Sequence, residues 1–293
     1  MKQEQSTIKT DVIKVLSWGL LFLFFSTCSE LDVEKKSPVP KQGGPFTTNH
    51  YFGAILDSAR VQGAILIYAA KDHTFYSNDF EWSKQGSLPA STFKIPNSII
   101  GLETGVVVGD STIFKWDGQP KALKVWEQDL RFREAFHYSC VPCYQQVARG
   151  VGYERMIAYI QKLGYGNIQF DSSQIDRFWL EGESKITPFQ QIDFLQRFYN
   201  AELPIKERTY SIMKKLMVME ENEQFKISGK TGWAIRNGNN RGWFVGYVET
   251  NDQVYFFASN IIPKEQFNMN FFPEIRKEIT YKALRSLNII PKT

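Results

Sequence analysis

The sequence predicts an α+β fold in which an antiparallel β-sheet is flanked by N- and C-terminal helices and carries an inserted all-helical lobe. Strand-like runs occur near both ends of the chain, at 63–76 and 225–261. The stretch between about 102 and 220 has mostly helical periodicity. Strands that return after a helical middle favour one sheet interrupted by a helical insertion.

Composition is that of an ordinary globular protein. The 293 residues are 43% hydrophobic and 23% charged, which is enough for one large domain or two small ones. The net charge of +4 is mild, and the lysines and arginines are scattered along the chain. This pattern predicts no nucleic-acid partner.

The first 28 residues have the pattern of a secretory signal. Basic residues precede an apolar run at 15–25, which is too short to span a bilayer comfortably. We therefore predict a signal peptide over 1–28 and a periplasmic protein; the alternative is a buried or membrane-embedded helix. Cys28 resembles a lipoprotein cleavage site, so lipid attachment and simple cleavage nearby both remain open.

A flexible linker is predicted at 29–46, where prolines and glycines lie among charged residues. If Cys28 carries a lipid, this linker would tether the protein to a membrane. The folded domain is then expected over 47–293, with its helical lobe at about 102–220.

The elements of this domain follow from hydrophobic periodicity. Apolar residues at helical spacing predict a helix at 50–61, and short apolar runs predict strands at 63–69 and from Thr74. Later strands are expected at 225–235, 242–249 and 253–261, with a final helix at 273–287. Asn237-Gly238 predicts a hairpin turn between the first two of these strands.

Pro89 to Asn97 contains the most informative pair of side chains. If a helix begins near Ser91, then Ser91 and Lys94 lie on one face, close enough to exchange a proton. A helix start also presents free N–H groups, which favour a developing oxyanion. Pro96 would remove a hydrogen bond inside such a helix, so we expect an irregular start.

A second Ser-x-x-Lys pattern, Ser211 to Lys214, serves as an internal comparison. It sits within 210–220, where apolar side chains predict one buried helix face with the lysines in water. The members of that face are Ile212, Met213, Leu216, Met217 and Met219. We interpret this second copy as structural.

The histidines and cysteines do not indicate a metal site. His50, His73 and His137 are far apart and show no metal-ligand spacing, and the chain has only three cysteines. We therefore predict neither a zinc site nor a Ser-His-Asp triad.

Lys230-Thr231-Gly232 lies inside the strand predicted at 225–235. Gly232 permits close approach of a ligand to the backbone, and the lysine and hydroxyl suit a substrate carboxylate. The alternative is a solvated lysine on an edge strand.

Taken together, these motifs resemble those of the class D serine β-lactamases, the oxacillinases. Ser91-x-x-Lys94, Ser139-Cys140-Val141 and Lys230-Thr231-Gly232 occur in the order found in serine β-lactamases and penicillin-binding proteins. The full set of matching segments is 89–98, 102–105, 114–118, 139–142, 165–167, 178–182, 230–232 and 254–258. The resemblance implies the fold of that superfamily and hydrolysis of penicillins or oxacillin through an acyl-Ser91 intermediate.

The resemblance also implies the base. The chain has Ser139-Cys140-Val141 where class A enzymes have Ser-Asp-Asn, and no counterpart of their deacylating glutamate is evident. In class D enzymes the base is the motif lysine carboxylated by carbon dioxide, here Lys94. No other cofactor is expected. Apolar surroundings would keep the amine neutral; their candidate members are Phe93, Val141, Tyr144, Trp179 and Leu180.

The remaining roles follow by matching motif positions. Trp179 would hold the carbamate through its indole N–H, with a plain core aromatic as the alternative. Ser139 would pass a proton to the leaving nitrogen, and the N–H groups of Ser91 and Trp233 would form the oxyanion hole. The residues expected to bind substrate are Val141, Lys230, Thr231, Gly232, Trp233 and Arg276. For Arg276 the alternative is a solvated residue on a helix surface.

Cys140 and Cys143 depart from the family pattern. We expect two small buried side chains here, with a disulfide or thiol catalysis as alternatives.

Two other functions share the three motifs: a slow D,D-peptidase of the penicillin-binding type, and a non-hydrolytic β-lactam sensor. The sensor needs several membrane spans, and this chain has one short apolar run. The preferred drug and the choice between monomer and homodimer stay open.

Overall fold

The computed structural model describes residues 44–236 and 238–292. The predicted signal peptide and most of the predicted linker therefore lie outside the described residues, as does Asn237 of the predicted hairpin turn. Phe46, which was expected to end the linker, already pairs with Phe75 as part of the sheet. None of the helices in the described ranges combines the length and apolarity needed to cross a membrane.

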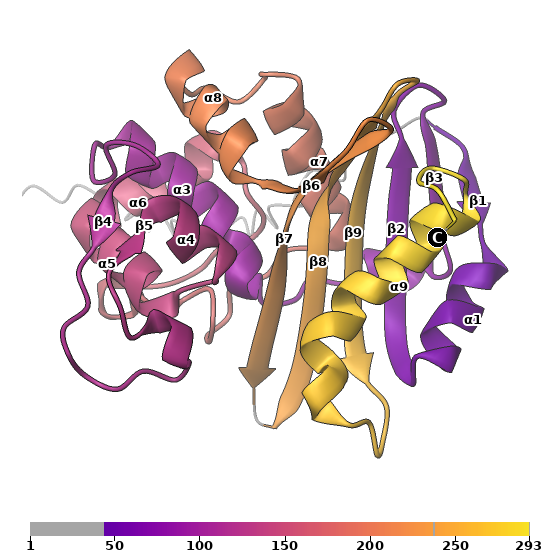
Figure 1. Cartoon of the computed structure of the whole chain (residues 1–293), viewed down its shortest axis with the longest axis horizontal. Coiled ribbons are helices and arrows are strands. Elements are labelled where there is room, and N and C mark those ends of the chain that lie inside the picture. Colours follow the sequence, from indigo (N-terminus) through magenta and orange to yellow (C-terminus); the bar gives the residue numbers. More distant parts are fainter. Residues whose placement is uncertain (1–43, 237, 293) are drawn as a thin grey trace, which may run out of the picture. The chain divides into compact units, whose positions relative to one another are not determined.

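The central element is a seven-stranded sheet in the order β1-β3-β2-β9-β8-β7-β6 (Figure 1). All neighbours in it are antiparallel except β1 and β3. This confirms the predicted α+β class and the predicted strands. Their bounds are β1 Phe46–Thr48, β2 Val61–Ala69, β3 Thr74–Ser77, β6 Val218–Glu221, β7 Phe225–Arg236, β8 Asn239–Thr250 and β9 Val254–Pro263.

Both faces of the sheet are covered, which explains the continuous apolar run in β2. Alternate residues of a strand point to opposite faces. Ile65 and Ile67 belong to one core cluster, with α1 (His50–Ser58) and α9 (Phe272–Ser286). Leu66 and Tyr68 belong to the other cluster, with the helical lobe. Figure 1 shows α9 crossing one face of the sheet and the lobe beside the other.

The lobe consists of short helices and one small hairpin between β3 and β6. Its helices include α3 Lys94–Glu103, α4 Phe132–His137, α5 Val141–Val151, α6 Tyr153–Leu163, α7 Pro188–Tyr199 and α8 Glu207–Leu216, preceded by α2 Phe80–Ser83. The hairpin pairs β4 (Ile113–Phe114) with β5 (Leu130–Arg131). The described ranges also contain four short 3-10 helices: η1 Ala90–Phe93, η2 Lys124–Trp126, η3 Ser172–Gln174 and η4 Met269–Phe271.

The prediction of one helix face over 210–220 is wrong at its C-terminal end. Helix α8 ends at Leu216, and β6 begins at Val218 and pairs with β7. Met219 is consequently 38% exposed, whereas Met217 is buried. Strand pairing with β7 ends the helix here, and the helical spacing of the methionines did not reveal that partner. Lys214 is exposed, as predicted.

Candidate active site

Ser91 lies in η1, and Lys94 is the first residue of α3. The α-helix thus begins three residues later than Ser91, and Pro96 falls in its first turn, where an N–H group needs no helical acceptor. This is the irregular start that the sequence predicts. Lys94 Nζ donates a hydrogen bond to Ser91 Oγ at 3.0 Å. Ser91 is 8% exposed and Lys94 only 1%.

The residue before Ser91 has a left-handed backbone. Ala90 has φ of +50°, a conformation that costs a non-glycine residue roughly 1–2 kcal/mol. Its N–H donates to the carbonyl of Trp179 at 2.8 Å. This hydrogen bond ties the turn that carries Ser91 to the segment that carries Trp179.

An aromatic wall surrounds the Lys94 amine. Phe93, Tyr144 and Trp179 are fully buried, and the Tyr144 ring centroid is 5.1 Å from Lys94 Nζ. Val141 and Leu180, the other two predicted members, are half-buried. Burial lowers the pKa of Lys94 to about 7. A substantial share of the amine is therefore neutral at neutral pH, which a lysine in water is not.

Trp179 carries an unsatisfied polar atom. Its indole Nε1 is buried and has no hydrogen-bond acceptor among the described residues. The ring itself stacks on Phe93 with centroids 5.6 Å apart. A buried N–H without a partner is costly, so an acceptor from outside the polypeptide fits this position.

Strand β7 forms the second wall, and Gly232 allows η1 to pack directly on it. A Cβ atom at Gly232 would lie 3.1 Å from Thr92 Cγ2 and 3.2 Å from Pro89 O. The group that approaches Gly232 closely is therefore the turn that carries Ser91, whereas the sequence predicted the approach of a ligand. Thr231 and Trp233, its neighbours, are both half-buried.

Lys230 is not the solvated edge lysine of the alternative interpretation. It is 4% exposed, and its Nζ lies 5.7 Å from the Phe136 ring centroid and donates to Thr231 O at 3.1 Å. Burial, with the charges of Lys94 and Arg276 adding to it, holds the pKa of Lys230 well below its usual value. The Lys230 amine therefore belongs to the same buried cluster as Lys94.

Arg276 comes from α9, on the far side of the sheet, and is likewise not a solvated surface residue. It is 8% exposed, and its Nη1 donates to the Gly232 carbonyl at 2.7 Å. The guanidinium also lies over the Trp233 ring, 5.8 Å from the centroid. A side chain on Gly242 would collide with Arg276, at 2.8 Å from Cδ. The sequence offered no signal for this role of Gly242.

Ser139 terminates α4 in a conformation that usually takes glycine. Its N–H bonds to Phe136 O at 3.1 Å, and the next N–H, of Cys140, bonds to Ala135 O at 2.8 Å. These two hydrogen bonds are those of a Schellman cap, with Ser139 at the left-handed position and φ of +54°. Because Phe136 faces Lys230, the cap places Ser139 on the turn next to that lysine.

Replacing Ser139 with glycine is expected to stabilise the protein while removing the hydroxyl. Glycine adopts the left-handed conformation without strain, so the free energy of unfolding should rise by about 0.5–1 kcal/mol after the entropy of the unfolded chain is deducted. Urea denaturation measures this gain. Ser139→Ala is the control, because it removes the same hydroxyl and keeps the strain; a gain of equal size in both variants would contradict the argument.

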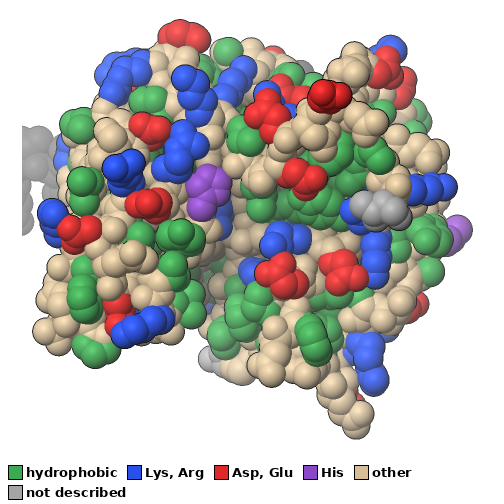
Figure 2. Space-filling view, viewed as in Figure 1, with side chains coloured by type: hydrophobic (Ala, Val, Ile, Leu, Met, Phe, Trp, Pro, Cys, Tyr) green, Lys and Arg blue, Asp and Glu red, His purple; other side chains and the backbone are tan. Residues whose placement is uncertain are grey.

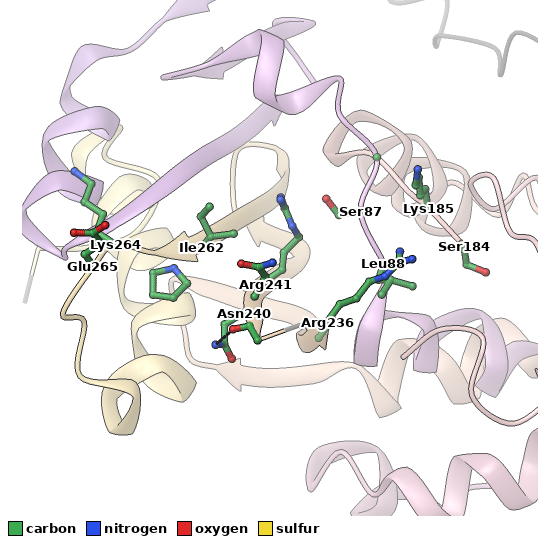
Figure 3. Close-up of a pocket in the computed structure, with 15 residues that line it drawn as sticks. Ser87, Leu88, Ser184, Lys185, Arg236, Asn240, Arg241, Ile262, Lys264 and Glu265 are labelled. Atoms are coloured by element: carbon green, nitrogen blue, oxygen red, sulfur yellow. Dashed lines mark hydrogen bonds between the residues drawn. The ribbon is translucent and has the colours of Figure 1, made fainter. Parts of the chain in front are cut away.

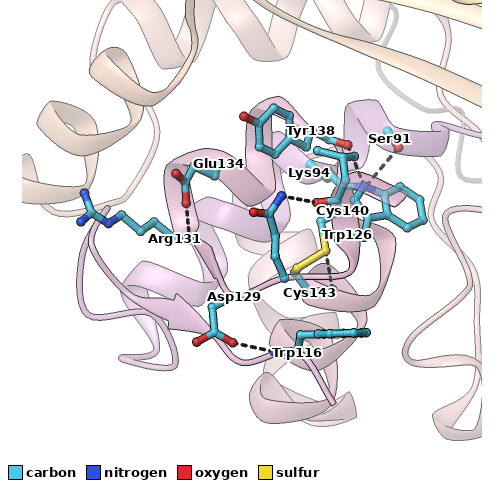
Figure 4. Close-up of a disulfide and its surroundings, with 12 residues drawn as sticks. Ser91, Lys94, Trp116, Trp126, Asp129, Arg131, Glu134, Tyr138, Cys140 and Cys143 are labelled. Carbon is cyan, nitrogen blue, oxygen red and sulfur yellow. Dashed lines mark hydrogen bonds between the residues drawn. A yellow bond between two sulfur atoms is a disulfide. The ribbon is translucent and has the colours of Figure 1, made fainter. Parts of the chain in front are cut away.

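Cys140 and Cys143 form a disulfide, so the expectation of two free buried thiols is wrong (Figure 4). Three residues apart at the start of α5, they lie at a separation that a helical turn brings together, with Cα atoms 5.4 Å apart. Figure 4 draws Ser91 and Lys94 among the surroundings of this bridge. Both sulfur atoms are bonded to each other, so neither cysteine has a thiol available for catalysis in this oxidised form.

A buried polar cluster behind the turn that carries Ser91 was not predicted from the sequence. Gln191 Nε2 donates to Thr92 Oγ1 at 2.9 Å, and Tyr165 Oη lies 3.4 Å from both Thr92 Oγ1 and Gln191 Oε1. Thr92 Oγ1 in turn donates to Pro89 O at 2.6 Å. These contacts fix the turn that aims Ser91. Gln191 lies inside an otherwise ordinary helix pattern, so no local signal in the sequence indicated that it would be buried against Thr92.

Ser91 and Lys94 thus lie together, Trp179 is tied to the residue before Ser91, and Lys230 is close enough for the charge of Lys94 to affect its pKa. Figure 2 shows a recess in the surface between the lobe and the sheet. A separate cavity of about 540 Å³ lies near the β7–β8 hairpin end (Figure 3). Its walls include Leu88, Arg236, Arg241 and Ile262, and none of the predicted site residues lines it. Within the described residues, His, Cys, Asp and Glu form no cluster of three or more that could hold a metal ion.

Comparisons with known proteins agree with this geometry. Residues 58–285 match the family model of the penicillin-binding protein transpeptidase domain. The chain is 40% identical over 250 residues to β-lactamase OXA-10 of Pseudomonas aeruginosa, covering 84% of this chain and 92% of that one. It is 35% identical to OXA-48 of Klebsiella pneumoniae over 95% of this chain and 100% of that one. The crystal structure of the class D β-lactamase YbXI from Nostoc superposes with a TM-score of 0.78 at 44% identity, covering 81% and 98%.

Proposed function

Because this chain belongs to the class D β-lactamases, and is therefore a β-lactam hydrolase, we propose that it acts through an acyl-Ser91 intermediate with carboxylated Lys94 as the base in both steps. One observation carries this proposal: a fully buried lysine amine with a lowered pKa lies 3.0 Å from the nucleophilic hydroxyl. A neutral amine is both a proton acceptor and a nucleophile toward carbon dioxide.

The surroundings of Lys94 fit a carboxyl group on its amine. Carboxylation forms a bond between Nζ and the carbon of carbon dioxide and releases one proton from the nitrogen. The group supplies an oxygen that can accept a proton. Trp179 Nε1, the buried donor without an acceptor, would bond the carboxylate, and the aromatic wall would exclude water that protonates the amine.

Each of the other groups would have one role in the acylation step. Ser91 attacks the lactam carbonyl as Lys94 takes its proton, and the N–H groups of Ser91 and Trp233 would stabilise the oxyanion. Ser139 would pass a proton to the lactam nitrogen as its bond to the carbonyl carbon breaks. Lys94 then activates the water that releases the product.

Substrate recognition would rest on the hydrogen-bond donors along β7 and the guanidinium behind it. Lys230 and Thr231 would bind the carboxylate of the drug, and Arg276 would add charge from behind Gly232. Val141, half-buried at the start of α5, would contact the body of the drug. Penicillins, oxacillin among them, are the proposed substrates, and their hydrolysis would confer resistance.

The site of action is proposed to be the periplasm. The pattern of basic residues and an apolar run in 1–28 supports export, and Cys28 supports a lipid tether.

Mass spectrometry with oxacillin tests the proposal. We expect an adduct of the mass of the intact drug on the Ser91 peptide, which decays faster when bicarbonate is added. An adduct on another residue would overturn the nucleophile, and decay that ignores bicarbonate would overturn the base. An adduct that never decays would instead indicate a sensor or a peptidase.

Activity is expected to fall as the pH drops through about 7. The Lys94 amine, with its pKa lowered to about 7, gains a proton below that pH and can no longer react with carbon dioxide. Added bicarbonate should restore part of the lost activity by raising the concentration of carbon dioxide. Oxacillin hydrolysis from about pH 5 to 9, with and without bicarbonate at constant ionic strength, measures this. A profile that bicarbonate leaves unchanged at every pH would contradict the expectation.

A further inference from the structure

Cys140 joins the two helices that flank the Ser139 turn. Its N–H closes the Schellman cap of α4 by bonding to Ala135 O, and it is the second residue after the C-cap residue, Tyr138. It is also the N-cap residue of α5, where its Sγ accepts from the N–H of Cys143 at 3.2 Å. Ser139 directly precedes Cys140 in the chain. Its backbone therefore has little conformational freedom as long as Cys140 stays in place.

The disulfide makes this junction covalent. Cys143 is the third residue of α5, and a capping box links these same two positions, the N-cap and the third residue, by hydrogen bonds. Sulfur is a weak acceptor compared with the hydroxyl or carboxylate oxygen of the usual N-cap residues. The covalent bond thus replaces a cap that cysteine alone would form poorly.

Helix α5 is the fixed side of the junction. Tyr144 and Val147, on its next turns, are fully buried in the main core cluster, and Tyr144 Oη bonds to Ser98 Oγ at 2.7 Å. The other side is a turn whose central residue, Ser139, has φ of +54°, which a serine does not favour. A bond from the anchored helix to Cys140 therefore holds the strained residue in place.

From this arrangement we propose that the Cys140–Cys143 disulfide is a positioning element for the Ser139 hydroxyl in acylation. The inference rests on the proposed function, in which Ser139 passes the proton to the lactam nitrogen. The bridge encloses a very short loop, so its effect on the entropy of the unfolded chain is small compared with that of a long-range disulfide. Its main consequence is local: the oxidised form acylates faster than the form without the bridge.

The bridge forms by thiol–disulfide exchange. One cysteine thiolate attacks the disulfide of a small-molecule or protein oxidant and expels one of its two thiolates. The second cysteine thiolate then attacks the resulting mixed disulfide and expels the other, so the protein loses two protons and two electrons and the oxidant is reduced to its thiol form. Cys140 and Cys143 are both buried in the folded protein, which hinders attack by reductants on the finished bridge. The redox state is accordingly set when the chain folds.

The test compares the oxidised full chain with the double variant Cys140→Ser and Cys143→Ser. Serine is a good N-cap residue, so this variant keeps a hydrogen-bonded cap and lacks only the covalent bond. The full chain refolded with dithiothreitol serves as a second bridge-free sample, and peptide mapping after alkylation assigns its thiols. Oxacillin acylation of Ser91 and subsequent deacylation are timed separately by rapid-quench mass spectrometry.

We expect acylation to slow by roughly tenfold or more in both bridge-free samples, since a misplacement of about 1 Å can cost as much as 100-fold. Deacylation should change less than about twofold, because Ser139 does not act in that step. A second round of unfolding and refolding, now with a disulfide oxidant in place of dithiothreitol, should restore acylation in the wild-type chain and leave the double variant unchanged.

Equal acylation rates in all samples would overturn the inference. Parallel losses of acylation, deacylation and melting temperature would overturn it as well, because they would show a merely structural role. If no sample forms an adduct on Ser91, the proposed function fails, and this inference fails with it. If an adduct forms on Ser91 at the same rate with and without the bridge, this inference fails and the proposed function stands.

Discussion

Replacing Lys94 with alanine is expected to lower steady-state oxacillin hydrolysis by about a thousandfold, since a positioned general base contributes roughly 10²–10⁴ to a rate. The variant lacks the proton acceptor for Ser91 and for the deacylating water. We expect at most a slow burst that ends in a trapped acyl-enzyme, visible as a stable adduct in the mass spectrum. Because Lys94 is buried, Lys94→Met is a second variant that fills the same volume and should lose turnover equally.

Lys214→Ala is the matched control for this prediction. Ser211 and Lys214 repeat the Ser-x-x-Lys spacing, but Lys214 is exposed on α8, over the ring of Tyr199. Its loss should leave hydrolysis within about twofold of wild type, since surface substitutions rarely act at a distance. Turnover by Lys94→Ala close to that of the wild type would remove Lys94 from the role of base.

Replacing Trp179 with phenylalanine is expected to have the second largest effect. The change keeps an aromatic ring against Phe93 and deletes the one indole N–H that has no acceptor in the described residues. Without that donor the carboxylated form of Lys94 should be less stable, and deacylation should slow by about tenfold or more, equivalent to roughly 1.4 kcal/mol. Carbon-13 spectra of enzyme equilibrated with labelled bicarbonate measure the carboxylated fraction directly.

Two comparisons make the Trp179 result specific. Trp116→Phe removes an indole N–H that donates to Gln119 O on the surface, and should change neither the carbon-13 signal nor the rate. Trp179→Ala should lose the signal too, but with a loss of about 3–5 kcal/mol in stability from the cavity it creates. If the carboxylated fraction is unchanged in Trp179→Phe, the indole does not hold the group.

Much of the site could be predicted because its chemistry is carried by residues near one another in the chain. The spacing of Ser91 and Lys94 places both on one turn whether that turn is α-helical or, as observed, a 3-10 helix followed by an α-helix. The apolar run of β2 likewise indicated a buried strand by itself. Such features depend on local geometry, which a single segment of sequence specifies.

Other outcomes were wrong or open at the sequence level because the local pattern permitted more than one structure. The chain stops being helical after Leu216 because β7 offers a strand partner to Val218–Glu221. The sequence could not decide whether Cys140 and Cys143 are free thiols or a disulfide, since a spacing of three residues suits either state. For Arg276, the helical pattern permitted a solvated arginine, yet it packs against Gly232 through the space left by Gly242.

By itself, the sequence determined the α+β class, the order of the motifs and the pairing of Ser91 with Lys94 on one turn. Only the tertiary structure decided which amines are out of water, whether Cys140 and Cys143 are joined, and where the unsatisfied indole N–H lies. The physical reason is that spacing along a chain is a local property. Desolvation depends on what other segments, remote in sequence, pack around a group, and it is desolvation that lowers the pKa of Lys94 to about 7.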